Sequence, residues 1–152
     1  MFRIKEYDYG ITLIDANMPG HPEFVGGYLI EEGDKAAFVE AGVGLSVPVF
    51  LDVLRFKKIP FENVAYVMVT HIHLDHAAGA GALIKHLPDA KLIVHPRGAK
   101  HLIDPSKLIS GAATVYGGIE NLKRLFGEIV PIPEERVIEA PEQFSIMLNE
   151  RK

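Results

Sequence analysis

Four residues of metal-binding types lie within six positions of one another: His71, His73, Asp75 and His76 in the run THIHLDH. In extended backbone, residues two apart point the same way, so His71 and His73 can direct two imidazoles at one point. Such ligands suit zinc, with iron or manganese as alternatives. Because one tetrahedral ion rarely takes four ligands from so short a loop, we expect His71 and His73 to bind one ion and Asp75 and His76 a neighbouring one. The alternative, a solvated polar loop, explains the clustering less well.

The residues on either side predict that this run is a strand-to-helix loop. A continuous apolar run at 64–69 is typical of a strand buried on both faces. Small and then apolar residues follow, and they indicate a helix from about His76 to Leu87. The rigid elements before and after the loop would hold its side chains in place at the surface.

THIHLDH resembles the HxHxDH signature of the metallo-β-lactamase superfamily, and much of the chain is similar to the glyoxalase II-like metal-dependent hydrolases of that group. Gly79 fits the DHxGG continuation of the signature, whereas Ala78 replaces its first glycine. The similar flavodiiron proteins carry Glu where this chain has His73, which argues against that redox branch.

The resemblance implies an α/β (α+β) fold, a four-layer αββα sandwich, with two divalent metal ions of which zinc is the favoured identity. It also implies an enzyme that hydrolyses a small ester, thioester or lactone through a metal-bound hydroxide. Asp75 is then both a ligand and the expected catalytic residue, which orients the water or accepts its proton. The family carries an Asp-x-Gly stretch near the metals, and its match here is Glu40-Ala41-Gly42. Glu40 and backbone carbonyls are the candidates to accept hydrogen bonds from the imidazole N–H groups that face away from the metals.

The resemblance covers only the first half to two-thirds of a family member. The family's further ligands are a His on a Gly-His strand, a bridging Asp and a last His, but this chain has no His after His101 and its sequence stops at Lys152. We therefore expect one domain over residues 1–152, truncated before the Gly-His strand. A half sandwich leaves an apolar sheet face uncovered, which favours a two-fold homodimer packed sheet on sheet.

Two other functions stay open from the residues alone. One is a catalytically silent half-domain that acts as a metal-binding or self-associating module. The other is a mononuclear-iron thiol dioxygenase within the same family. Metal content and metal identity would separate them from the dinuclear hydrolase.

Composition excludes several other classes. The 152 residues are 48% hydrophobic and 24% charged with a net charge of −4 and no basic cluster, which is typical of a soluble globular protein and argues against nucleic-acid binding. The chain has no cysteine, so disulfides and thiolate metal ligands are excluded. The charged N-terminus and the lack of a long apolar run predict a cytoplasmic protein with no membrane partner. The family resemblance implies a small-molecule substrate.

The remaining elements follow from periodicity and turn residues. We expect strands within 2–16, 24–30, 36–39, 64–70 and 91–95, and a last strand through Phe144, Ile146 and Leu148. Helices are expected from a Ser46 cap to Lys58, over 97–103, and toward Phe126 in an amphipathic stretch weakened by glycines. The other candidates for the site, His21, His86, His95 and His101, fit loop, surface or structural roles better, and Tyr116 fits core packing better than a place over the pocket.

Overall fold

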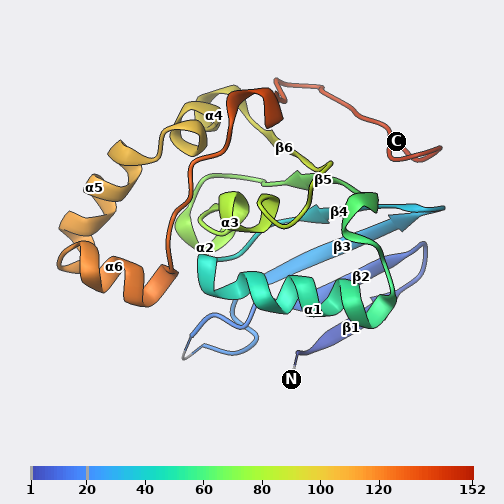
Figure 1. Ribbon diagram of the computed structural model, residues 1–152, viewed down its shortest axis with the longest axis horizontal. Coiled ribbons are helices and arrows are strands. Elements are labelled where there is room, and N and C mark those ends of the chain that lie inside the picture. Colours follow the sequence, from blue (N-terminus) through green and yellow to red (C-terminus); the bar gives the residue numbers. More distant parts are fainter. Residues whose placement is uncertain (1, 20) are drawn as a thin grey trace.

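The computed structural model describes residues 2–19 and 21–152, and its core is one seven-stranded sheet whose strands follow one another in chain order (Figure 1). The strands are β1 (Ile4–Tyr7), β2 (Ile11–Asp15), β3 (Gly26–Glu32), β4 (Lys35–Val39), β5 (Val64–Met68), β6 (Lys91–Val94) and β7 (Val137–Glu139). Pairing is antiparallel from β1 to β4 and parallel from β4 to β7. The carboxyl ends of β4, β5 and β6 therefore meet at one edge of the sheet, where ligands usually bind in such folds.

The helices are α1 (Val47–Lys57), α2 (Leu74–Ala77), α3 (Ala80–Ile84), α4 (Pro96–Ile103), α5 (Ser106–Tyr116) and α6 (Ile119–Phe126). Helices α1 and α3 lie over one face of the sheet, while α5 and α6 form a hairpin beside it (Figure 1). On the covered face, Phe50 of α1 meets Phe38 of β4 edge to face, with ring centroids 5.3 Å apart. The expected mixed α/β fold is confirmed. In the described part of the chain, no helix has the length and apolar character needed to cross a membrane.

The opposite face of the sheet is apolar and only partly covered. Tyr28 on β3 is 41% exposed there. Near β5, the C-terminal segment crosses this face, and Phe144 and Leu148 line a small cavity together with Tyr66 and Met68. The face predicted to be uncovered is thus partly covered by the chain itself, and the two-fold dimer stays a prediction.

Two expected helices are each divided into two shorter helices in the structure. The helix expected from His76 to Leu87 is divided into α2 and α3, and the stretch toward Phe126 is broken between α5 and α6 at Gly117 and Gly118, both at positive φ. Glycines adopt that backbone region without the steric penalty that a Cβ brings, so they end the helix there.

The strand expected at the C-terminus is wrong. The alternation of Phe144, Ile146 and Leu148 predicted a strand, but these residues pack on the open sheet face without joining the ladder, and the last strand is β7.

The helix expected from a Ser46 cap to Lys58 is confirmed as α1, of which Ser46 is the N-cap residue, but the Ser46 side chain makes no cap bond. Its hydroxyl accepts a hydrogen bond from the Val43 N–H at 3.3 Å instead.

Lys57 fastens the last turn of α1 to the sheet. Its side chain is 12% exposed, and its Nζ lies 2.9 Å from Glu31 of β3 and also pairs with Glu6 of β1. Burial lowers the pKa of Lys57, but the hydrogen bonds to Glu6 and Glu31 outweigh it, so the pKa lies above its usual 10.5.

Replacement of Lys57 by Met is expected to lower the free energy of unfolding by about 1 kcal/mol at pH 7, because two carboxylates lose their cation. Since the folded pKa is raised, this stabilisation is complete below about pH 10.5 and is lost as the pH rises through the folded value. Urea unfolding of both proteins between pH 7 and 12 measures the difference. A difference that grows with pH would contradict the assignment.

Candidate metal centre

The metal loop, residues 70–76, is held against the end of β4 by backbone hydrogen bonds. The Val69 N–H donates to the Ile93 carbonyl at 3.1 Å, which extends the pairing of β5 with β6 up to the loop. The Ala41 N–H donates to the His76 carbonyl at 2.9 Å, and the Gly79 N–H donates to the Gly42 carbonyl at 2.9 Å. The loop and the turn at 40–42 therefore form one unit at the carboxyl edge of the parallel strands.

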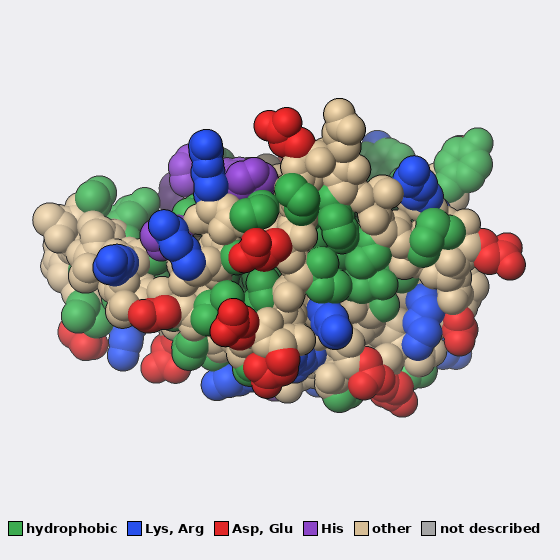
Figure 2. All heavy atoms as spheres, turned by 90° about the horizontal axis from the view of Figure 1, so that it is seen from above, with side chains coloured by type: hydrophobic (Ala, Val, Ile, Leu, Met, Phe, Trp, Pro, Cys, Tyr) green, Lys and Arg blue, Asp and Glu red, His purple; other side chains and the backbone are tan. Residues whose placement is uncertain are grey.

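Three predicted or suspected site residues converge in this unit. One ligand atom each from Glu40, His71 and His76 lies within 4.8 Å of the other two. The rings of His71 and His76 have centroids 4.2 Å apart. His71 and His73 are exposed. Figure 2 shows several histidine side chains close together near the upper edge of the molecule, and another that lies apart from them.

The other two predicted ligands lie at the border of this group. The His73 ring meets the His71 ring edge to face at a centroid distance of 4.6 Å, but His73 is outside the three-residue group. The Asp75 carboxylate lies 3.4 Å from Nε2 of His76. The structure thus brings all four predicted residues into one neighbourhood, and how they divide between two ions stays a prediction.

Thr70 links His71 to Glu40 and so determines the tautomer of His71. The Thr70 hydroxyl donates a short hydrogen bond to the Glu40 carboxylate, which can only accept. The same hydroxyl oxygen lies 2.9 Å from Nδ1 of His71. Because its one proton is directed to Glu40, the hydroxyl must accept from the Nδ1–H of His71. This leaves the lone pair of Nε2 on His71 available to a metal ion.

Glu40 also faces His76. Its second oxygen, Oε2, lies 3.5 Å from Nδ1 of His76. Both atoms are buried, and neither has a hydrogen-bond partner among the described residues. A buried polar atom without a partner is costly, so a bound ion or ligand that paired with these atoms would stabilise the site.

The backbone conformation of Glu40 is what points its carboxylate at both imidazoles. Its φ is +67°, in the left-handed region, and the residue is only 6% exposed. A non-glycine residue in that region costs on the order of 1 kcal/mol, and such strain is concentrated at functional sites. Its N–H donates to the Met68 carbonyl at 2.7 Å, which holds the turn against β5.

The donor set fits a divalent cation. Two ligands bound at about 2.1 Å in a tetrahedral zinc site lie about 3.4 Å apart. The separation of Asp75 Oδ2 from His76 Nε2 is 3.4 Å, which matches this ligand spacing. Glu40 faces the Nδ1 sides of His71 and His76, which is the place of the carboxylate in a carboxylate–histidine–metal arrangement.

An open pocket of about 530 Å³ adjoins the metal loop. His73 and Asp75 form its polar wall. The rest of the lining comes from the metal loop, the loop before β3 and the α5–α6 hairpin: Met18, Phe24, Ile72, Leu74, Leu108, Val115, Tyr116 and Phe126. A cavity of this size with one polar wall is typical of small-molecule sites.

Glu40 and Tyr116 have a larger part in the site than the sequence predicted. Glu40 was only one candidate partner for the imidazoles; its place follows from the parallel pairing of β4 with β5, which brings the ends of both strands to one edge. Tyr116 was expected in the core, but it is 38% exposed and lines the pocket. No local signal could have placed it there, because its position depends on how the α5–α6 hairpin packs.

The remaining histidines lie outside the cluster. His95 is the N-cap of α4, where its Nδ1 accepts a hydrogen bond from the Arg97 N–H at 3.2 Å, so the structural role expected for it is confirmed. His86 is exposed after α3, and His101 lies on α4. His21 stacks against Phe24 at a centroid distance of 5.6 Å.

Replacement of Glu40 by Gln is expected to weaken zinc binding by roughly 10–100-fold, because the amide keeps the shape but loses the charge that orients His71 and His76. Competition with a chromophoric chelator measures the affinity. Glu134→Gln makes the same chemical change at an exposed glutamate outside the metal-binding group, and it serves as the control. An affinity equal to that of the control would show that Glu40 does not orient the imidazoles.

Comparisons with known proteins identify the family of the chain and relate its fold to solved structures. The family model described as the metallo-beta-lactamase superfamily matches residues 22–145. No curated protein matches the chain.

Similar solved structures share the fold at low sequence identity. An archaeal metallo-β-lactamase superfamily protein from Sulfolobus tokodaii is 24% identical, with a TM-score of 0.70 over 95% of this chain and 53% of that one. A metallo-β-lactamase from Cronobacter sakazakii is 18% identical, with a TM-score of 0.63 over 91% of this chain and 47% of that one. The native FEZ-1 metallo-β-lactamase from Legionella gormanii is 14% identical, with a TM-score of 0.62 over 90% and 46%. The chain spans about half the length of these structures. With a family match over most of its residues, this chain belongs to the metallo-β-lactamase superfamily.

Proposed function

We propose that the chain carries the first metal-binding half of a hydrolase that cleaves a small ester, thioester or lactone with two divalent ions, zinc being the favoured metal. The observation that carries this proposal is the buried pair formed by Glu40 Oε2 and His76 Nδ1. These atoms have no hydrogen-bond partner among the described residues and lie beside exposed imidazoles at the mouth of a pocket. Superfamily membership supports the same reaction class.

Each side chain of the loop has a distinct task in this proposal. His71 and His73 would hold one ion, and Asp75 and His76 the other. Divalent ions in such a site lower the pKa of water and polarise a substrate carbonyl. Glu40 would orient both rings: it accepts a hydrogen bond from Thr70, whose hydroxyl pairs with Nδ1 of His71, and its Oε2 faces Nδ1 of His76 at 3.5 Å.

Asp75 is the residue best placed to take a proton from the attacking water. It lies on the pocket wall with a side chain that is 32% exposed, so one carboxylate oxygen can face the substrate while the other faces His76. A general base must lie within hydrogen-bond reach of the proton that it removes, and the pocket leaves room for water there.

The alternative function is a catalytically silent module that binds metal or associates with itself. It is favoured by one observation: the metal loop supplies four ligand side chains for two ions, whereas a catalytic zinc normally takes three protein ligands.

Metal content and turnover together distinguish the two functions. The hydrolase predicts about two zinc ions per chain after dialysis and zinc-dependent turnover of p-nitrophenyl butyrate and γ-butyrolactone. Turnover should disappear on chelation and in the His71→Ala variant. Less than about half an ion per chain and no turnover above that of the variant would contradict the hydrolase and support the silent module.

A further inference from the structure

The pocket beside the metal loop exposes large apolar side chains that a soluble protein normally buries. Val115 is 79% exposed, Phe24 is 67% exposed and Tyr116 is 38% exposed, and all three line this pocket. Exposed apolar side chains grouped around a cavity mark a binding site more often than a solvated surface.

The walls of the pocket are firmly supported. Tyr116 at the end of α5 packs edge to face on Phe126 of α6, with ring centroids 4.9 Å apart. The base of the hairpin is anchored by Leu122 and Phe126, which are 2% and 3% exposed. The apolar wall therefore belongs to a packed helical pair, and its position relative to His73 and Asp75 is set by the fold.

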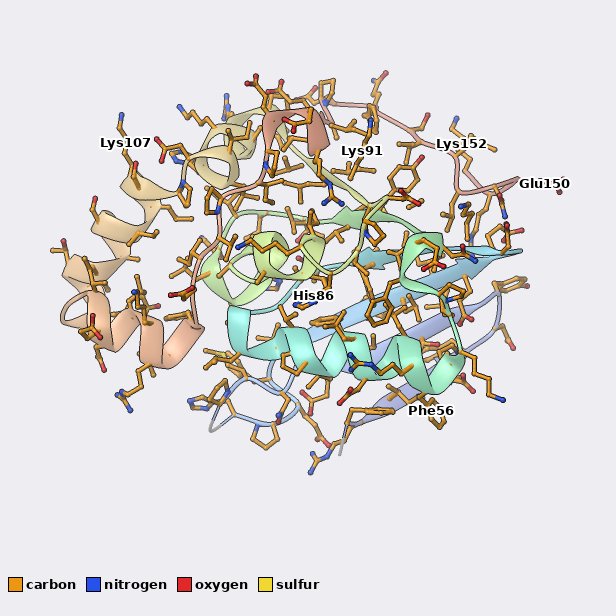
Figure 3. The ribbon with its side chains drawn as sticks, viewed as in Figure 1. Phe56, His86, Lys91, Lys107, Glu150 and Lys152 are labelled. Carbon is orange, nitrogen blue, oxygen red and sulfur yellow. The ribbon has the colours of Figure 1, made fainter. Side chains whose placement is uncertain are left out.

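The charge of the lining limits what can bind. Asp75 carries the only carboxylate among the described lining residues, and none of these residues is Lys or Arg. Lys107, in the first turn of α5, points outward from the molecule (Figure 3). An anionic group in the apolar part of the pocket would lose hydration without gaining a cation, which is strongly unfavourable.

We propose that the apolar part of this pocket binds an uncharged alkyl chain of medium length, so that the substrate is a neutral alkyl ester or lactone. The inference rests on the proposed hydrolase and specifies its substrate class. The chain would lie between Phe24, Val115 and Tyr116, and the carbonyl group would lie at the polar wall formed by His73 and Asp75. Thioesters with large anionic carriers are then poor substrates.

The test uses binding of 2-alkanones, which are neutral and cannot be hydrolysed, to the full chain in the presence of zinc. From 2-butanone to 2-octanone, affinity measured by ¹⁵N NMR titration is expected to rise about threefold to fourfold for each added methylene. The largest shift changes are expected at Ile72, Val115 and Tyr116.

Two substitutions on the same hairpin make the test specific. Val115→Lys places a charge in the pocket and is expected to weaken 2-octanone binding on the order of tenfold while 2-butanone binding is little changed. Ile119→Lys changes a residue that is 51% exposed and outside the lining, and it should leave both affinities unchanged. Both sites are exposed, so neither variant should fail to fold.

Affinity that does not rise with chain length, or that falls equally in both variants, would overturn the alkyl-binding pocket. This result is independent of catalysis. Chain-length-dependent ketone binding in a protein that hydrolyses no ester would support the pocket and count against the proposed hydrolase. Ester turnover without selective ketone binding would support the proposed hydrolase and count against the alkyl-binding pocket.

Discussion

The His71→Ala variant is expected to bind zinc at least about 100-fold more weakly than the unmodified chain, because it loses a ligand rather than a residue that orients one. The His71 ring contacts both His73 and His76, so its loss also removes packing that keeps the three imidazoles together. Chelator competition at pH 7.5 measures the affinity. Since His71 is exposed, the free energy of unfolding without zinc should change by less than about 0.5 kcal/mol.

His86→Ala is the matched control for this experiment. It makes the same chemical change at an exposed histidine that follows α3 and lies outside the group of Glu40, His71 and His76. It should leave zinc affinity unaltered. If both variants bound zinc equally well, the metal loop would not be the site that holds the ion.

The second large effect is expected from Gly79→Ala, which should lower the free energy of unfolding by about 3 kcal/mol. A Cβ at position 79 would lie 2.5 Å from the Ala41 carbonyl oxygen and 2.6 Å from that of Val43. Both atoms belong to the backbone, so the metal loop and the turn at 40–42 must move apart. Because Glu40 is on that turn, zinc affinity should fall together with stability.

Gly111→Ala is the control for the glycine change. Gly111 lies within α5, and a Cβ there would meet no atom within 4 Å. This variant should gain roughly 0.5–1 kcal/mol, because alanine loses less conformational entropy in a helix than glycine does. Urea unfolding measures the free energy of unfolding of both variants. Equal stability of Gly79→Ala and Gly111→Ala would show that the two loops are not closely packed.

The part of the site that could be predicted from sequence is the part that is local. The ligand types and spacing of 71–76 are continuous in the chain, and the apolar run before them predicted the strand that ends at the loop. The role of Glu40 required the pairing of β4 with β5 and a left-handed backbone, and only the first could be suspected from the order of elements.

The features that could not be predicted depend on packing between distant segments. The pocket exists because the α5–α6 hairpin lies near Phe24 and the metal loop. Hydrophobic periodicity predicts single helices and strands, but it does not predict how closely these segments pack. The alternation at 144–148 was typical of a strand, but the apolar side chains found a partner in the open sheet face instead. Alternating apolar residues indicate that one face of a segment is buried. Whether the segment is a strand depends on a neighbouring strand that can accept its backbone hydrogen bonds.

The central claim is that the side chains at 71–76, oriented by Glu40, converge on a divalent ion. Anomalous diffraction at the zinc edge from zinc-soaked crystals tests it most directly. A peak is expected within about 2.2 Å of imidazole nitrogens of the metal loop, with the Glu40 carboxylate hydrogen-bonded behind them. Imidazoles that point apart, with no peak among them at millimolar zinc, would contradict it.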